Sequence, residues 1–300
     1  MTTTAAQRQF YKGIVSYGAL GVLPTLPGVS LNVNENYAIP PIIGNYWQWN
    51  FGQGFINPTL ETSFVFRDVS TELMTPSSTG TTPANFFDYA HMRSNDGAHD
   101  VASIGNITIQ PSGTGDALVL MNAKIASYQM SCSKGGEIVI RASFVGTGVT
   151  TLGTALTFAG WSNANILRFK NVSFASPLDN QVWEWGYNFS NNMTPCMALN
   201  GSEFPADQNA GMQTASMNIS TQIATTNRPD NGTFPVPGTL APIVVIIAGT
   251  TKTLTATFPN PINNTKRNRQ IASGRVMQAS QYTLLGGDGI SSSPANIVIA

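Results

Sequence analysis

The stretch Trp47-Gln48-Trp49-Asn50-Phe51 recurs as Trp183-Glu184-Trp185-Gly186-Tyr187, 136 positions later. In both copies an aromatic residue stands at every second position, and a period of two places all three rings on one face of a β-strand. We therefore expect two strands with buried aromatic faces. The expected core residues are Trp47, Trp49 and Phe51 in the first strand, and Trp183, Trp185 and Tyr187 in the second.

A second correspondence follows the first along the chain. The segment from Gly136 to Phe144 aligns with the segment from Gly274 to Tyr282, at an offset of 138. Two nearly equal offsets indicate an internal duplication. The sequence thus predicts a mainly β protein with two tandem β-domains, residues 31–150 and 151–285. Residues 1–30 and 286–300 would form an N-terminal and a C-terminal arm.

The composition limits the classes of partner. The 300 residues include 15 basic and 15 acidic side chains, and charged residues make up only 10% of the chain. Such a surface does not attract nucleic acid or a membrane through net charge. A hydrophobic content of 42% excludes a disordered chain.

Targeting and redox signals are absent from the sequence. The start, from Met1 to Arg8, lacks the basic residues and apolar run of a signal peptide. No apolar run reaches the length of a membrane span, so we expect no membrane partner. Cys132 and Cys196 are open to a disulfide, but because no oxidising compartment is indicated, two buried free thiols are favoured.

Long loops and the chain end are candidate contacts with other subunits. The loop Val69–Asp100 contains a short helical pattern with Phe86, Phe87 and Tyr89, and a loop of this length is usually functional or an interaction element. The apolar, β-branched end Ile297-Val298-Ile299 follows a glycine-rich linker. It is suited to adding a strand to a neighbouring sheet, with a frayed tail as the alternative.

The search for chemistry predicts no catalytic, cofactor or metal site, so we expect that the protein is not an enzyme. His91 and His99 lie near acidic residues, but among Ser, Asn and Gly we favour solvated loop residues over a metal site. Glu184 faces away from the neighbouring tryptophans on a strand, and its counterpart is Gln48, which argues against a glycosidase. The basic cluster Lys266, Arg267 and Arg269 could contact phosphate or another subunit, although a solvated loop is favoured.

The order of aromatic strand, long loop, short helix and closing strands resembles the tail tube proteins of long-tailed bacteriophages. The likeness lies in the segments 123–139 and 273–289, and it covers most of residues 30–290. In this family the fold is a small β-sandwich or barrel with a flanking helix. Six copies close a ring around a channel, the rings stack through a long loop and terminal arms, and DNA passes through the lumen.

This resemblance implies a duplicated tube domain, each copy with a short helix, so that three subunits make a pseudo-sixfold ring. The protein would be a structural component of the virion tail, assembled in the host cytoplasm. Its partners would be itself, other tail proteins, and genomic DNA that passes without specific binding. The loops Val69–Asp100 and Thr225–Gly238 would join rings, and the two arms would join subunits. Two strand pairs would line the channel with their polar faces: Ala117–Met130 with Glu137–Val145, and Thr251–Phe258 with Gly274–Leu285.

One feature departs from a neutral or acidic conduit. The expected channel segments carry eight basic residues: Lys124, Lys134, Arg141, Lys252, Lys266, Arg267, Arg269 and Arg275. Side chains that point into the lumen would oppose the conduit function, whereas side chains at subunit seams would not. Two alternatives stay open. One is another tail, baseplate or capsid-surface protein; the other is a carbohydrate-binding β-sandwich, which predicts exposed Trp47 and Trp183.

Overall fold

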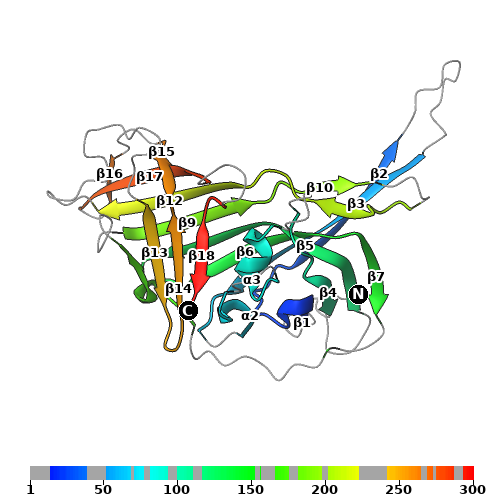
Figure 1. Cartoon of the computed structure of the whole chain (residues 1–300), viewed down its shortest axis with the longest axis horizontal. Helices are drawn as coiled ribbons and strands as arrows, with labels where there is room; N and C mark the ends of the chain where they lie inside the picture. Colours follow the sequence, from blue (N-terminus) through cyan, green and yellow to red (C-terminus); the bar gives the residue numbers. More distant parts are fainter. Residues whose placement is uncertain are drawn as a thin grey trace, which may run out of the picture.

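The structure is a computed structural model, and it is mainly β with a large antiparallel sheet and a smaller second sheet (Figure 1). It describes residues 14–38, 52–68, 71–77, 82–93, 100–110, 117–152, 156, 166–175, 182–197, 202–222, 242–264, 269–272, 275–286 and 293–300. The expected core residues Trp47, Trp49 and Phe51, as well as His99, Lys266 and Arg267, lie outside these ranges.

The strands are β1 (Ile14–Tyr17), β2 (Ser30–Ala38), β3 (Gly52–Val65), β4 (Gly105–Gln110), β5 (Ala117–Ser133), β6 (Val139–Val145), β7 (Gly148–Leu152), β8 (Val172–Phe174), β9 (Val182–Ser190), β10 (Thr194–Cys196), β11 (Asp207–Asn209), β12 (Thr214–Gln222), β13 (Ile243–Ala248), β14 (Thr253–Phe258), β15 (Asn260–Asn263), β16 (Arg269–Ala272), β17 (Arg275–Leu285) and β18 (Asn296–Ile299). Two short α-helices are described, α2 (Thr71–Met74) and α3 (Phe86–His91).

The large sheet has 12 strands, and its main path runs β15-β17-β12-β9-β5-β6-β3-β2. Strand β12 shows why such strands form. Its buried side chains Ala215, Met217, Ile219 and Thr221 alternate with Ser216, Asn218 and Ser220, which are half-buried or exposed. This period of two gives the sheet one apolar and one polar face.

The strand β5 belongs to two layers. Its first part pairs with β4 and β7, and its second part pairs with β6 and β9. The layer β1-β4-β5-β7 covers the apolar face of β3 and β6: the Tyr17 ring lies 6.1 Å from the Phe64 ring and 5.6 Å from the Phe144 ring. The first half therefore consists of two packed layers of strands. Residues 14–30, expected in a terminal arm, are part of this core, because Tyr17, Leu20 and Leu23 are buried in it.

The smaller sheet covers the second half in the same way. It has four strands in the order β18-β14-β13-β8. The Phe258 ring lies 5.0 Å from the Tyr187 ring, and the Phe174 ring lies 6.3 Å from the Trp185 ring. Strand β14, which we expected beside β17 in the channel wall, instead belongs to this covering sheet.

The strand order of the first half recurs in the second. The large sheet contributes β2-β3-β6-β5 to the first half and β9-β12-β17-β15 to the second, with β16 also pairing with β17. The covering strands are β1-β4-β5-β7 and β8-β13-β14-β18. The strand registers also agree. Ser63 of β3 pairs with Arg141 of β6, and at the corresponding position of the second half Ser220 of β12 pairs with Ala279 of β17. Strand β9 thus holds the position of β2, so the Trp183 stretch corresponds in space to the chain near Ser30 and not to the Trp47 stretch.

The helix α3 is a feature of the first half. The Asn85 side chain caps its N-terminus by accepting hydrogen bonds from the backbone of Phe87 and Asp88, at 2.9 and 3.0 Å. The Phe86 and Phe87 side chains are buried against Tyr128 of β5. The equivalent connection of the second half, residues 223–241, lies outside the described ranges.

Candidate functional site

The polar face of the large sheet carries transverse rows of side chains that form hydrogen bonds. Strand pairing aligns one row across six strands, and the neighbouring row starts at Glu61 and continues with Ser143, Ser127 and Ser190. The first row consists of Ser63, Arg141, Gln129, Asn188, Ser216 and Thr283. Hydroxyl and amide groups dominate both rows, so the face is hydrated and nearly uncharged.

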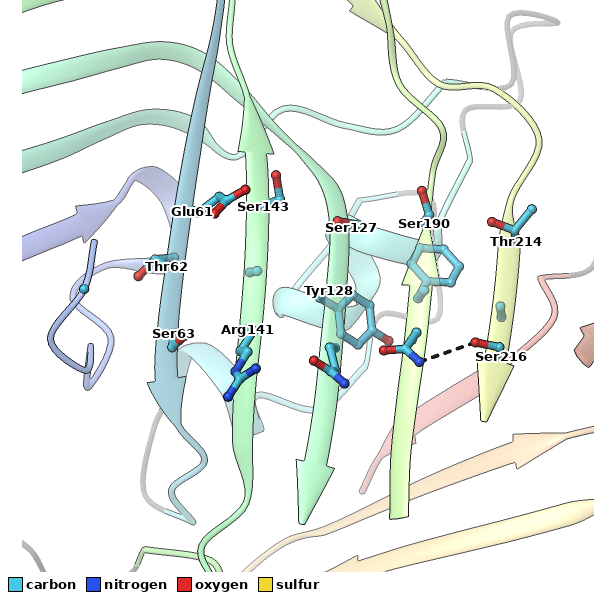
Figure 2. A pocket seen from close by; sticks show the side chains of 16 residues that line it. Glu61, Thr62, Ser63, Ser127, Tyr128, Arg141, Ser143, Ser190, Thr214 and Ser216 are labelled. Carbon is cyan, nitrogen blue, oxygen red and sulfur yellow. Dashed lines mark hydrogen bonds between the residues drawn. The ribbon is translucent and has the colours of Figure 1, made fainter. Parts of the chain in front are cut away.

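The centre of this face is hollowed. The hollow has a volume of about 580 Å³ and crosses β3, β6, β5, β9 and β12. Figure 2 shows Glu61, Arg141, Ser143 and Thr214 standing on its strands, while the Asn188 amide donates to the Ser216 hydroxyl at 3.4 Å. The Tyr128 and Phe189 side chains are buried beneath it. A broad, shallow hollow without an exposed aromatic platform fits a hydrated wall better than a pocket for a small ligand.

Few charges lie on this face. In the strands β3, β5, β6, β9, β12 and β17, the described side chains that carry charge are Glu61, Lys124, Arg141 and Glu184. Lys124 is buried away from the hollow, so the face holds one cation and two anions. The side chains of Arg269 and Arg275 are not described. Most of the eight basic residues named above as opposing a conduit therefore lie away from this polar face or outside the described part of the chain.

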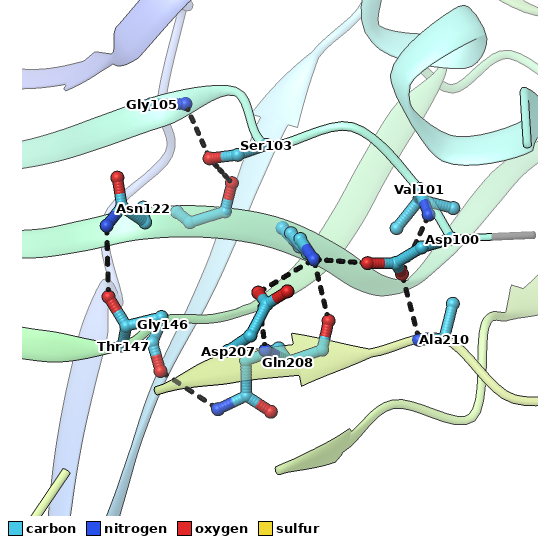
Figure 3. Close-up of polar contacts among 12 residues, drawn as sticks. Asp100, Val101, Ser103, Gly105, Asn122, Gly146, Thr147, Asp207, Gln208 and Ala210 are labelled. Carbon is cyan, nitrogen blue, oxygen red and sulfur yellow. Dashed lines mark hydrogen bonds and ion pairs between the residues drawn. The ribbon is translucent and has the colours of Figure 1, made fainter. Parts of the chain in front are cut away.

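Lys124 anchors a segment of the second half onto the first (Figure 3). Its ammonium group donates to Asp100 Oδ2 at 2.5 Å, to Asp207 Oδ1 at 2.9 Å and to the Gln208 carbonyl at 2.8 Å. The side chain of Gln208 donates to Asn57 Oδ1 and to the Gly146 carbonyl. All three ammonium protons are satisfied, and the hairpin β10-β11 is held against β5.

The seam between the halves is the pairing of β5 with β9, and α3 lies against it. His91 Nε2 forms a hydrogen bond of 2.7 Å with the Tyr128 hydroxyl, and Nδ1 forms one of 2.8 Å with the Ser293 hydroxyl. The imidazole also lies 4.0 Å from the Phe189 ring. Burial, with a smaller effect of the Arg93 charge, lowers the pKa of His91 to about 3, so the ring is neutral at physiological pH.

Asn191 strengthens the same seam. Its amide donates to the Ala90 carbonyl at 3.0 Å and to the Ile125 carbonyl at 2.9 Å, and the residue is fully buried. One side chain at the end of β9 therefore ties together α3 and β5. The seam is a specific, polar and apolar interface rather than a loose contact between two bodies.

The aromatic residues of the second expected core strand lie on β9. Trp185 and Tyr187 are buried, whereas Trp183 is only half-buried and lies under the Lys134 ammonium, 3.7 Å from its ring centroid. The alternation of buried side chains thus extends from Trp185 to Phe189, and Trp183 lies near the start of β9, where its carbonyl accepts a hydrogen bond of 2.8 Å from the Lys134 amide. Glu184 is exposed on the opposite face, as the pleat requires.

Several expected subunit contacts are used within the chain. Phe86 and Phe87 are fully buried, so they cannot touch another subunit in this state; Tyr89 is half-buried. The chain end forms β18, which pairs with β14, and this pairing buries Ile297 and Ile299. The expectation that the tail is an inter-subunit arm is thus wrong for these two residues, because their own sheet supplies the pairing edge. Val298 remains exposed.

The remaining titratable groups form no reactive cluster. No group of three or more metal-ligating side chains occurs within the described ranges. Both nitrogens of His91 are engaged, and Asp88 accepts a hydrogen bond from the backbone of Ala84. Burial raises the pKa of Cys132 to about 11. Both cysteines are free, but Cys196 is exposed, so the expectation of burial is wrong for this residue.

Among the described residues no helix is long and apolar enough to cross a membrane. No protein-family model and no curated protein sequence matches the chain. Sequence reasoning missed the Lys124 cluster and the covering sheet, because both depend on pairings between distant segments.

Proposed function

We propose that this chain is a structural virion protein that self-assembles into stacked rings, which form the tail tube of a long-tailed bacteriophage. The tube would be the conduit for DNA delivery to the host. The observation that carries the proposal is the repeated strand order, joined head to tail at the seam of β5 and β9. Two tandem tube-like domains in one chain would account for this repeat.

The two ends of the large sheet support self-assembly. Strand β2 forms one end of the main path and β15 forms the other. Because β9 holds the position of β2, and β15 holds that of the second part of β5, the edge at β15 can accept β2 of another copy as β5 accepts β9. Figure 1 shows the two edges at opposite ends of the sheet. Head-to-tail contacts of this kind generate closed rings or open filaments.

The polar face supports a conduit. In a ring it would be the wall of the lumen, and rows of Ser, Thr, Asn and Gln would stay hydrated while DNA passes. With one described cation and two anions, such a wall would not hold the phosphates strongly. Three chains would give a pseudo-sixfold ring, with other tail proteins as further partners and with no membrane, cofactor or catalytic role.

The test is electron microscopy of the purified chain together with its solution mass. Hollow tubes, or stacked rings with three chains per layer, are expected. Rings that never stack would favour a distal tail, baseplate or capsid-surface protein. A chain that remains monomeric on concentration and with preformed tail components would overturn the proposal.

A matched pair of variants sharpens the test. Val33 lies on the edge strand β2 with 40% exposure, and Met212 lies in a connection with 80% exposure. A lysine on an open edge opposes strand pairing. We expect Val33→Lys to abolish ring formation, Met212→Lys to leave it intact, and both variants to keep the wild-type melting temperature.

A further inference from the structure

The polar face carries a single described cation, Arg141, which lines the hollow from β6. Its strand neighbours in the row are Ser63 on β3 and Gln129 on β5, and Asn188 follows on β9. The Arg141 side chain is exposed and has no hydrogen-bond or ion-pair partner among the described residues. Figure 2 shows the Arg141 side chain next to Ser63 among the residues that line the hollow. The row therefore offers one charged fork and several neutral donors to an anion.

We propose that Arg141 is the point at which this face contacts a phosphodiester backbone, with Gln129, Asn188 and Ser63 as neutral donors beside it. A guanidinium matches a phosphate with two parallel hydrogen bonds, and neighbouring strands space the donors about 4.8 Å apart. The contact reads no bases, because phosphates carry no sequence information. This inference deepens the proposed function, since it names the group of the wall that DNA would touch.

The opposing charges keep the contact weak. Glu61 lies in the neighbouring row of the same hollow, and Glu184 lies further along the face on β9. Neither carboxylate forms an ion pair with Arg141 in the described structure. They repel a polyanion while Arg141 attracts it, so the backbone is touched but not retained. A conduit for DNA needs attraction and repulsion of this kind to offset each other, so that the DNA can move on.

The second half supplies a natural comparison. Ala279 pairs with Ser220 in the register in which Arg141 pairs with Ser63, and Ala279 is exposed. The fold therefore offers this position twice, but only the first half has an arginine there; the second half has Ala279. Ala279→Arg would add the second contact at a site that tolerates a long side chain.

The experiment measures binding of a short fluorescein-labelled DNA duplex to the dispersed full chain by anisotropy, across a series of salt concentrations. Arg141→Gln is expected to weaken binding about tenfold at low salt. It should also reduce the slope of log K against log salt by about 0.9, the value for one phosphate. Ala279→Arg is expected to strengthen binding and to increase the slope by a similar amount. The matched control Arg168→Gln removes an exposed arginine that pairs with Glu137 and should change neither quantity beyond the general effect of charge.

Three results would overturn the inference: no binding by the wild type, equal losses in Arg141→Gln and Arg168→Gln, or unchanged binding by Arg141→Gln. Titration with inorganic phosphate separates the two sources of this chemistry. A saturable site for free phosphate that is tighter than the duplex contact also argues against a polymer ligand. Electron microscopy of Arg141→Gln and of the wild type distinguishes the two proposals. If Arg141→Gln forms normal rings but binds DNA more weakly, Arg141 acts in DNA contact and not in assembly. If the wild type forms no rings, that result counts against the proposed assembly alone.

Discussion

The two halves have the same strand order but end their sheets differently. In the first half one long strand, β5, serves both layers and then pairs with β9. In the second half the corresponding positions are divided among β14, β15 and β16, and the edge of β15 has no further strand in the described chain. The same architecture therefore continues into a further strand at β5 and ends at an edge strand at β15 within the described chain. In the proposed assembly, the seam of β5 and β9 would be the contact that is repeated between chains.

The comparison extends to the connections. In the second half, the connection between β9 and β12 carries the hairpin β10-β11, which lies on the first half through Lys124. In the first half, β2 and β3 project beyond the sheet (Figure 1). An isolated two-stranded ribbon is marginally stable in water. The connection that carries β10 and β11 supports this ribbon, because the Ile56 amide donates to the Glu203 carbonyl at 2.8 Å and the Gln208 side chain donates to Asn57 Oδ1 at 2.8 Å.

The largest effect is expected from the core of the second half. Trp185→Ala should lower the free energy of unfolding by about 3–5 kcal/mol, because a fully buried ring leaves a cavity. The half-buried Trp183 provides the control, and Trp183→Ala should cost clearly less. Chemical denaturation followed by circular dichroism measures both. A second transition that appears only in Trp185→Ala would show that the halves unfold separately, whereas a single shifted transition would show that the seam couples them.

The next effect concerns the Lys124 cluster. Lys124→Met leaves Asp100 and Asp207 without their cation and should destabilise the fold by about 2–3 kcal/mol, below the range for fully buried pairs because Asp207 is half exposed. Hydrogen exchange should rise in residues 194–209 before it rises in β12. The exposed pair of Arg168 and Glu137, with atoms 3.5 Å apart, is the comparison. Arg168→Met should change stability by less than about 0.5 kcal/mol, and equal effects in the two variants would contradict the anchoring role.

Between pH 7 and pH 5, a smaller effect of about 2 kcal/mol is expected at the seam. The pKa of His91 is about 3 in the folded chain and close to 6.5 in the unfolded chain, so the unfolded state binds the proton more tightly. The stabilisation is complete above pH 6.5 and is lost as the pH falls toward 3, by up to about 1.4 kcal/mol per pH unit. Melting curves between pH 7 and pH 5 should show this slope in the wild type. His91→Gln keeps a hydrogen-bonding side chain and should flatten the slope; an unchanged slope would exclude His91 as its source.

The sequence predicted the local features because they depend on neighbouring residues. The alternation in Trp183–Tyr187 and Met212–Ile223 identified β9 and β12, and the pattern around Phe86 identified α3. The pairing of distant segments could not be predicted in this way. The alignment of the two tryptophan stretches assigned the wrong counterpart to β9, because the connections between β3 and β4 and between β12 and β13 differ in length and shift the register of the repeat.

The candidate site was harder to predict for the same reason. The burial of a lysine depends on which distant segments lie against it. Lys124 is buried among Asp100 of the first half and Asp207 and Gln208 of the second. The C-terminal strand shows a similar limit. The composition of Ile297-Val298-Ile299 indicated strand addition, but the choice between its own sheet and another chain's depends on the free edge of β14.

In the proposed assembly, the seam of β5 and β9 would also determine how many chains close a ring. Each half is rotated relative to the other by an angle that this seam holds within a single chain. If the contact between chains repeats the seam, the same rotation is applied at every step, and the number of halves in a closed ring equals one full turn divided by that angle. The diameter of the proposed channel would then be set by the geometry of one strand pair inside the chain.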